Sequence, residues 1–183
     1  MQYLAKEQII EATEKVFAAF TSTCKSIDDS KFFISLSGKW SVAENIKHLV
    51  VSTNASALAY TLPAFIVRSV GGKPNRDSRS YEQLVEKYKI KLAEGGKASG
   101  IFIPKKQDER NGKEVLIKQW EIAAQKFIKA LKSKRTSEIK LDDYLARHPL
   151  LGRITLRELC YFTIYHTEHH LNIIKKLAEG NQV

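Results

Sequence analysis

Residues 155–179 read TLRELCYFTIYHTEHHLNIIKKLAE, and this stretch decides the fold. Thr155 and Glu158 form a capping-box pattern, which predicts a helix that begins here and runs to about residue 179. At about 100° per residue, one face of this helix collects apolar side chains together with two histidines: Leu159, Phe162, Thr163, His166, His170, Ile173 and Leu177. An apolar face of this length must meet a core, so the segment predicts a long helix packed against other helices.

Four further segments have helical patterns, and they cover residues 4–25, 41–61, 80–94 and 113–134. Ser41 with Glu44 and Ser80 with Gln83 repeat the capping-box pattern at two of the expected starts. Pro63 is expected to kink or end the second helix, because proline lacks an amide hydrogen. The helix at 113–134 has six candidate core residues: Val115, Leu116, Ile122, Ala123, Phe127 and Leu131.

The connections between these helices contain glycine, proline and charged residues. Residues 97–112 predict a long exposed loop, and a weak strand signal is confined to the run at 100–103. Long amphipathic helices joined by loops predict an all-α, up-and-down four-helix bundle with an additional short helix or long loops. We expect residues 1–183 to form a single domain, because this length suits one core.

Composition excludes several classes of protein. Hydrophobic residues make up 43% of the chain and charged residues 27%, which is ordinary for a globular domain. No run approaches the roughly 20 apolar residues that a membrane-spanning helix needs, and the first residues do not resemble a signal peptide. We therefore expect a cytoplasmic protein without a membrane partner, in which Cys24 and Cys160 are reduced thiols.

The net charge of +10 comes from 30 basic and 20 acidic side chains. This charge favours anionic partners such as nucleic acid or acidic metabolites. The basic residues are dispersed, however, and no motif that reads nucleic acid accompanies them, so a solvated basic surface is the simpler interpretation. The sequence also contains no P-loop, no dinucleotide-binding glycine motif and no nucleophile elbow.

His166 and His170 lie one helical turn apart in the middle of the apolar face. Two imidazoles at this spacing can bind one metal ion, which would satisfy nitrogens that are costly to bury. Core histidines bonded to carbonyl groups or water would explain the pair as well. Residues 166–170 read HTEHH, which is not the H-E-x-x-H motif: Glu168 points away from this face, and His169 lies at its edge.

A third metal ligand has to come from another helix, and His48 is the best candidate. It shares a face of the 41–61 helix with small and polar residues that could border a cavity: Ser41, Glu44, Ser52, Ala55 and Ala59. Taken alone, His48 would be interpreted as a partly exposed histidine. Cys160 lies about 120° from His166 around the helix, so packing explains it better than a Cys–His pair.

Two motifs resemble those of a known family. Residues 40–49, WSVAENIKHL, resemble the W-x-x-x-E-x-x-x-H-L motif of the DinB-like four-helix bundles. The end of the chain is similar to the family as well, because His148-Pro149 and Gly152 precede the last helix and His166-x-x-x-His170 lies within it. The order and spacing agree over nearly the whole chain, and the distinct motif residues cover the second and the last helix of the bundle.

The resemblance implies one divalent metal ion bound by His48, His166 and His170. Glu44 matches the acid of the motif, but it is also the expected capping residue, so we weigh capping or support of a ligand above direct ligation. His169 would be a ligand in place of its neighbour if the register differed by one residue. We interpret His148 as a loop residue that either lies at the site or caps a loop near it. Family analogy also implies a homodimer.

Three histidine ligands leave at least one coordination position open. A water there would become a usable nucleophile, and a thiol there would be held as its thiolate, so hydrolysis and thiol transfer are both open. Zinc and nickel both suit imidazole ligands.

Relatives in the family include transferases that use bacillithiol or mycothiol, and a maleylpyruvate isomerase. The resemblance therefore implies a metal-dependent transferase or hydrolase that acts on a small molecule, with a low-molecular-weight thiol as a candidate cofactor. The alternative is a non-catalytic metal- or ligand-binding stress-response module of the same fold. The sequence does not identify the substrate.

Overall fold

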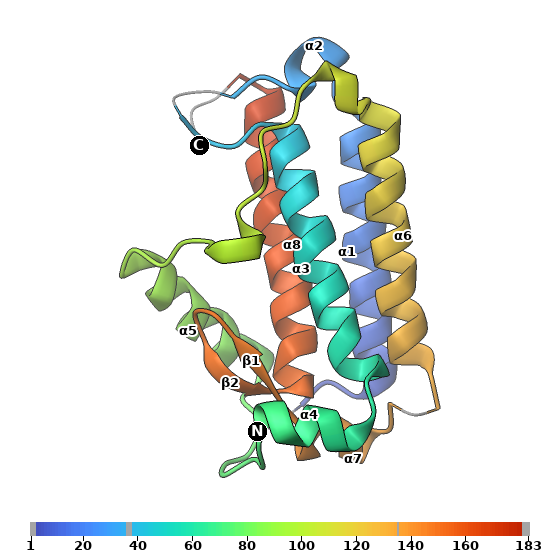
Figure 1. Ribbon diagram of the computed structural model, residues 1–183, viewed down its shortest axis with the longest axis vertical. Helices are drawn as coiled ribbons and strands as arrows, with labels where there is room; N and C mark the ends of the chain where they lie inside the picture. Colours follow the sequence, from blue (N-terminus) through green and yellow to red (C-terminus); the bar gives the residue numbers. More distant parts are fainter. Residues whose placement is uncertain (1–2, 36–37, 135, 181–183) are drawn as a thin grey trace.

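Four long helices form the main body of the protein in the computed structural model, which describes residues 3–35, 38–134 and 136–180 (Figure 1). They are α1 (Lys6–Ser26), α3 (Val42–Thr61), α6 (Lys113–Lys132) and α8 (Leu156–Ala178). Helix α3 packs against α6 and α8, and α1 packs against the same two helices. The predicted all-α four-helix bundle is therefore confirmed.

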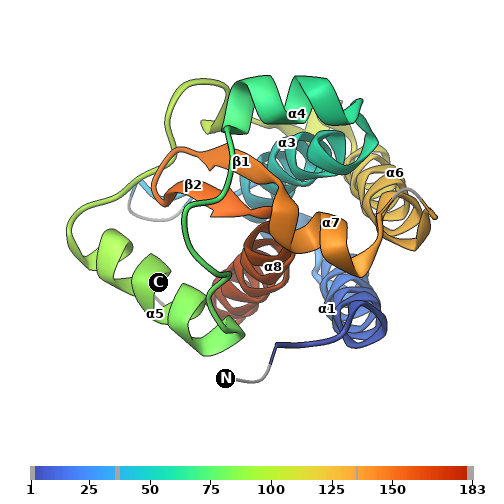
Figure 2. The same cartoon turned by 90° about the horizontal axis from the view of Figure 1, so that it is seen from below.

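The direction of the four helices is set by one long connection. Helices α1 and α8 run toward one end of the bundle, and α3 and α6 run toward the other (Figure 1). The connection between α3 and α6 returns the chain to the end where α3 begins, through α4 (Ala64–Gly71), α5 (Tyr81–Ala93) and the 3-10 turns η1 (Gly100–Phe102) and η2 (Glu109–Asn111). Seen along the bundle, α5 lies outside the four long helices, on the side of α8 (Figure 2).

Aromatic side chains fill the core between the four helices. The Trp120 ring lies 5.0 Å from Phe17 and 4.9 Å from Phe20, and the Tyr60 ring lies 5.6 Å from Phe127. These side chains are almost fully buried. Burial of a large apolar side chain contributes about 1.5–3 kcal/mol. These contacts hold α1 and α3 against α6.

The outer face of α6 corrects one prediction. The expectation that Val115 and Ile122 belong to the core is wrong, since both side chains are 55% exposed. The buried face of α6 is centred on Trp120, and these two residues lie about 140° and 160° from it around the helix. The other four candidates on this helix are buried as expected: Leu116, Ala123, Phe127 and Leu131.

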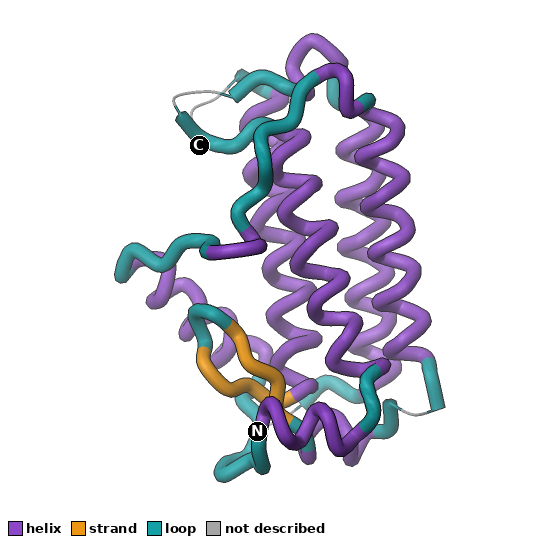
Figure 3. The backbone as a smooth tube through the Cα atoms, in the orientation of Figure 1, coloured by secondary structure: helices purple, strands orange, loops and turns teal. Residues whose placement is uncertain are grey.

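Several short elements were not predicted. Helix α2 (Asp29–Phe32) follows α1, and α7 (Glu138–Asp143) precedes an antiparallel hairpin of β1 (Leu145–His148) and β2 (Gly152–Thr155) (Figure 3). The strand signal at 100–103 is wrong, because residues 100–102 form the turn η1. In the hairpin, Leu145 pairs with Thr155 and His148 pairs with Gly152.

A close contact fixes the hairpin beside the bundle. Helix α3 ends at Thr61 and Pro63 is the N-cap of α4, so proline ends the helix as predicted. Helix α4 then packs against β1. A Cβ atom at Gly71 would lie 1.8 Å from the carbonyl oxygen of Leu145, so only glycine allows this approach.

Within the three described ranges, no single helix is long and apolar enough to cross a membrane. Helices α3 and α4 pass the criteria of length and composition only as a pair, across a bend of 117°.

Candidate metal centre

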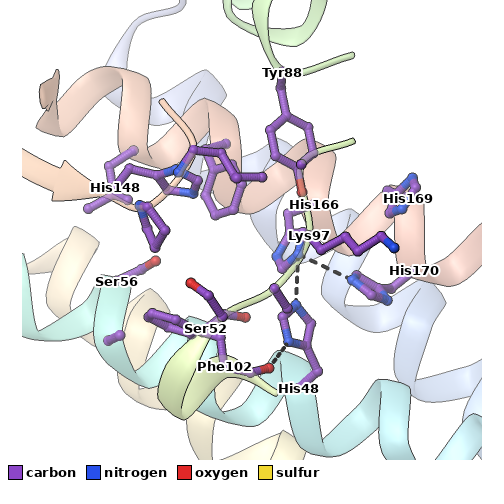
Figure 4. A pocket seen from close by; sticks show the side chains of 18 of the residues that line it. His48, Ser52, Ser56, Tyr88, Lys97, Phe102, His148, His166, His169 and His170 are labelled. Atoms are coloured by element: carbon purple, nitrogen blue, oxygen red, sulfur yellow. Dashed lines mark hydrogen bonds between the residues drawn. The ribbon is translucent and has the colours of Figure 1, made fainter. Parts of the chain in front are cut away.

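The three predicted metal ligands meet at one place between α3 and α8 (Figure 4). The Nε2 atom of His166 lies 3.0 Å from Nε2 of His48 and 3.2 Å from Nε2 of His170. Each of the three residues is only 5% exposed. The structure thus brings together three buried imidazole donors that could hold one ion.

The capping boxes set the positions of these histidines on their helices. The Glu44 carboxylate accepts a hydrogen bond from the Ser41 amide at 2.7 Å, and the Ser41 hydroxyl accepts one from the Glu44 amide. Thr155 and Glu158 form the same pair of bonds at the start of α8. These capping predictions are confirmed, and Glu44 lies outside the group of donors. Its second hydrogen bond comes from the hydroxyl of Ser35.

Hydrogen bonds on the far side of two rings fix their tautomers. His48 Nδ1 lies 2.7 Å from the Phe102 carbonyl oxygen, and His170 Nδ1 lies 2.6 Å from Asn45 Oδ1. Both oxygens can only accept, so Nδ1 carries the proton in each ring and Nε2 presents a lone pair to the group. A separate bond fixes which end of the Asn45 amide faces His170: the amide nitrogen donates to the Ser41 carbonyl oxygen at 2.8 Å, so the amide oxygen is the atom beside His170.

The converging lone pairs create a demand for a cation. Two of them, from His48 and His170, face Nε2 of His166. A single proton on the Nε2 atom of His166 cannot form a good hydrogen bond to both neighbouring nitrogens at once. One of the two lone pairs would then be buried without a partner, which costs free energy. A single cation between the rings would satisfy all three nitrogens.

Burial keeps the three imidazoles neutral. It lowers the pKa of His48, and it lowers the pKa values of His166 and His170 well below the ordinary value of 6.5. Neighbouring histidines lower these pKa values further, because a positive charge on one imidazole disfavours protonation of the imidazole beside it. Neutral imidazole is the form that binds a metal, so at neutral pH the group is ready to act as a ligand set.

Two of the three separations between the donors fit a tetrahedral ion, and all three donors lie within 4.8 Å of one another. Zinc binds imidazole nitrogen at about 2.0–2.1 Å, which places two tetrahedral ligands about 3.3 Å apart. The separations of 3.0 and 3.2 Å in this group are close to that value. Three nitrogen ligands also leave a coordination position for another molecule, as catalytic sites do.

The three histidines border a cavity of about 700 Å³. It lies between α3, α5, α8, the hairpin and η1, and all five histidines of the chain line it. The small residues of α3 that share a face with His48 line it as predicted: Ser52, Ala55 and Ala59. Trp40 covers the group, with its ring 5.0 Å from that of His48 and 6.4 Å from that of His170. The size suits a small-molecule ligand.

The other two histidines have different surroundings. His148 Nδ1 accepts hydrogen bonds from the amides of Leu150 and Leu151, so it caps the hairpin turn, and burial lowers its pKa to about 4. His169 is half-buried beside His170 and lies outside the group of three donors. The predicted register of α8 is therefore the one observed.

Both cysteines are free thiols in the core. The Cys160 sulfur lies 3.0 Å from the hydroxyl of Tyr60, and burial raises its pKa to about 12. Burial also raises the pKa of Cys24. Neither thiol is ionised at neutral pH, so packing is the role that the structure supports for both.

Four residues of the site were not predicted. Asn45 and Phe102 bond the ligand rings, and Tyr88 and Lys97 line the cavity. Asn45 lies one helical turn before His48, so helical spacing contained a signal for it. Phe102 belongs to the short apolar run at 100–103, which was unusual within a polar segment.

The fold and the site together define a class: a four-helix bundle protein with a buried set of three histidines suited to a divalent metal. The sequence matches the DinB superfamily over residues 12–174, and the chain belongs to this superfamily. The matched range includes all three histidines. Comparisons with curated proteins and with solved structures gave no match.

Proposed function

We propose that this protein binds one divalent transition-metal ion, zinc or nickel, on His48, His166 and His170. With this ion bound, the protein is a transferase or hydrolase that acts on a small molecule. The supporting observation is that three neutral Nε2 donors converge at the edge of a cavity of about 700 Å³. A purely structural ion is usually enclosed by four protein ligands, whereas three ligands beside a cavity leave room for a substrate.

The surrounding residues have defined tasks in this proposal. The Phe102 carbonyl group and the Asn45 amide hold two ligand rings in place, and Trp40 shields the group from solvent. A divalent ion supplies a Lewis acid that lowers the pKa of an oxygen or sulfur ligand. A low-molecular-weight thiol is a suitable cofactor, and the net charge of +10 favours the approach of acidic ones.

The metal content of purified protein tests the ligand assignment. Protein prepared without chelators is expected to contain about one zinc or nickel ion per chain. His48→Ala and His170→Ala should each lose most of it, because two imidazoles form a weak site. His169→Ala is the matched control, since this histidine lines the same cavity but lies outside the donor group. Full metal content in His48→Ala, or none in the wild type, would contradict the assignment.

Turnover tests the catalytic part of the proposal. Metal-loaded wild type is expected to transfer thiols to electrophiles or to hydrolyse esters or amides, and His48→Ala should be inactive in the same assays. If the wild type binds its metal but shows no turnover across thiol acceptors and hydrolase substrates, the non-catalytic metal-binding module becomes the better description.

A further inference from the structure

The cavity is much longer than the metal centre. Its wall on α3 runs from His48 to Leu62, which corresponds to about 21 Å of helix. Ser52 and Ser56 line the middle of the cavity, and toward α4 most of the wall is apolar, with Arg147 at its exposed rim against Val70. The apolar residues at this end are Leu62, Ile66, Val67, Val70 and Leu145. Leu58 and Val70 are about half exposed, at 48% and 51%, so this end is open to solvent. The shape and lining fit an extended apolar chain.

The charged residues around the cavity all have one sign. Lys39, Lys97 and Arg147 line it, and among the described lining residues there is no aspartate or glutamate. Arg147 donates to the Val70 carbonyl oxygen. Lys97, which follows α5, forms no hydrogen bond or ion pair with any other described residue, and in Figure 4 its ammonium group points toward His169 and His170. An unpaired cation beside the metal centre favours an anionic ligand.

Tyr88 supplies a second polar group at the same end. It is 6% exposed, and its ring packs against Phe162 and His166. A phenol carries its proton at neutral pH, so the hydroxyl can donate a hydrogen bond. In the part of the chain that the structure describes, this hydroxyl forms no hydrogen bond, and it points toward His166 in Figure 4. It is thus a free donor beside the ligand group.

We propose that the substrate is an anionic amphiphile with a straight apolar chain, such as an aliphatic carboxylate. Its acidic group lies beside the metal centre, where Lys97 and Tyr88 bind it, and its chain lies along α3 toward α4. This proposal rests on the proposed function for the metal but makes a separate prediction about binding. Lys97 and Tyr88 determine specificity for charge, and the apolar wall determines specificity for chain length.

Calorimetric titration of zinc-loaded protein with hexanoate, octanoate and decanoate tests the chain site. Burial of each added methylene group should tighten binding about fourfold, so decanoate should bind about 15-fold more tightly than octanoate. Decyltrimethylammonium has the same chain and the opposite charge, and it should bind at least tenfold more weakly than decanoate. Equal affinity for the three acids, or tighter binding of the cation, would overturn the proposal.

Paired variants separate the two ends of the site. Lys97→Met should weaken decanoate binding about tenfold, the lower end of what a charged hydrogen bond supplies, and Tyr88→Phe should weaken it several-fold. Lys126→Met, an exposed lysine on α6 outside the cavity, should have no effect. Ala55→Trp blocks the cavity halfway along α3, between the histidines and the apolar end, and should abolish the dependence on chain length. Ala18→Trp, on the exposed face of α1, is its control.

The same titrations distinguish this inference from the metal proposal. If wild type contains no metal but still binds decanoate in a manner that depends on chain length and Lys97, the metal proposal fails and the amphiphile site is supported. If metal binds to the three histidines but Lys97→Met and Ala55→Trp leave decanoate binding unchanged, the amphiphile site is wrong. The thermal unfolding midpoint of each variant verifies that it has folded, whether or not metal is bound.

Discussion

The Asn45 side chain links the start of α3 to the metal centre. Its amide nitrogen donates to the Ser41 carbonyl oxygen, and its Oδ1 accepts the Nδ1 proton of His170 at 2.6 Å. This pair of bonds holds the His170 ring so that Nε2 faces the other two donors. Partners of this kind orient a ligand and raise its basicity, and their loss typically reduces metal affinity.

Asn45→Ala is expected to weaken metal binding about 10- to 100-fold while leaving one ion per chain at saturating metal. The reason is that all three ligands remain, but one ring loses its fixed orientation. Competition with a chromogenic chelator measures the change. Asn54→Ala is the matched control, because Asn54 lies on the same helix and bonds only the backbone, through the Val50 carbonyl oxygen. Equal affinities for the wild type and Asn45→Ala would show that Asn45 does not support the site.

The ligands could be predicted from the sequence, whereas their supporting partners could not. Helical spacing alone puts His166 and His170 on the buried face of α8. The small and polar face of the second long helix selects His48, and the matching motif gives the same residue. The bond from His48 to Phe102 joins residues 54 positions apart, and it depends on how the long connection folds back over α3. No local pattern encodes that path.

At the scale of elements, the cap of α8 matters because this helix carries two ligands. Thr155 is fully buried, and its hydroxyl accepts a hydrogen bond from the Glu158 amide. The same hydroxyl lies 2.7 Å from the Ser78 hydroxyl. Thr155→Ala should lower the free energy of unfolding by about 1 kcal/mol, because an amide of the first turn loses its acceptor. Urea denaturation measures the loss. Thr155→Ser keeps the hydroxyl and should recover most of it, and if it is as unstable as Thr155→Ala, the lost methyl contacts matter more than the cap.

Long and short elements differed in how well they could be predicted. The starts of α3, α5 and α8 followed from capping boxes, since these interactions lie within one turn of chain. The hairpin instead depends on the contact between Gly71 and Leu145, and α8 follows it through a bond from the Leu156 amide to the Tyr144 carbonyl oxygen. Such elements form because distant segments meet, so periodicity within a short window does not reveal them.

At the scale of the whole molecule, a buried carboxylate ties the long connection to the bundle. The Glu158 side chain is fully buried and accepts hydrogen bonds from both terminal nitrogens of Arg76, at 2.7 and 2.8 Å. Arg79 adds a further ion pair at 3.1 Å. These contacts fix the segment before α5 against the start of α8. Since α5 supplies Tyr88 to the cavity, the network stabilises the wall that faces the metal centre.

This network predicts how stability depends on pH. Burial alone would raise the pKa of Glu158, but the bonds from Arg76, Arg79 and Thr155 outweigh it and lower the pKa below the ordinary value of 4.5. The unfolded chain therefore binds a proton more readily than the folded one. The contribution of Glu158 is fully present above about pH 5 and is lost as the pH falls through the ordinary value and then through the folded-state pKa.

Comparison with Glu158→Gln isolates this contribution. At pH 7 the variant should be less stable by about 2 kcal/mol, because two half-buried guanidinium groups lose the charged acceptor to which they are hydrogen-bonded. The difference should shrink as urea denaturation is repeated from pH 7 toward pH 3, because the wild type becomes protonated there as well. The histidines are the same in both proteins, so their titration cancels in the difference. Glu168→Gln, an exposed change on the same helix, should match the wild type throughout. A difference between the wild type and Glu158→Gln that stays constant down to pH 3 would mean that packing, and not the charge of Glu158, holds the long connection to α8.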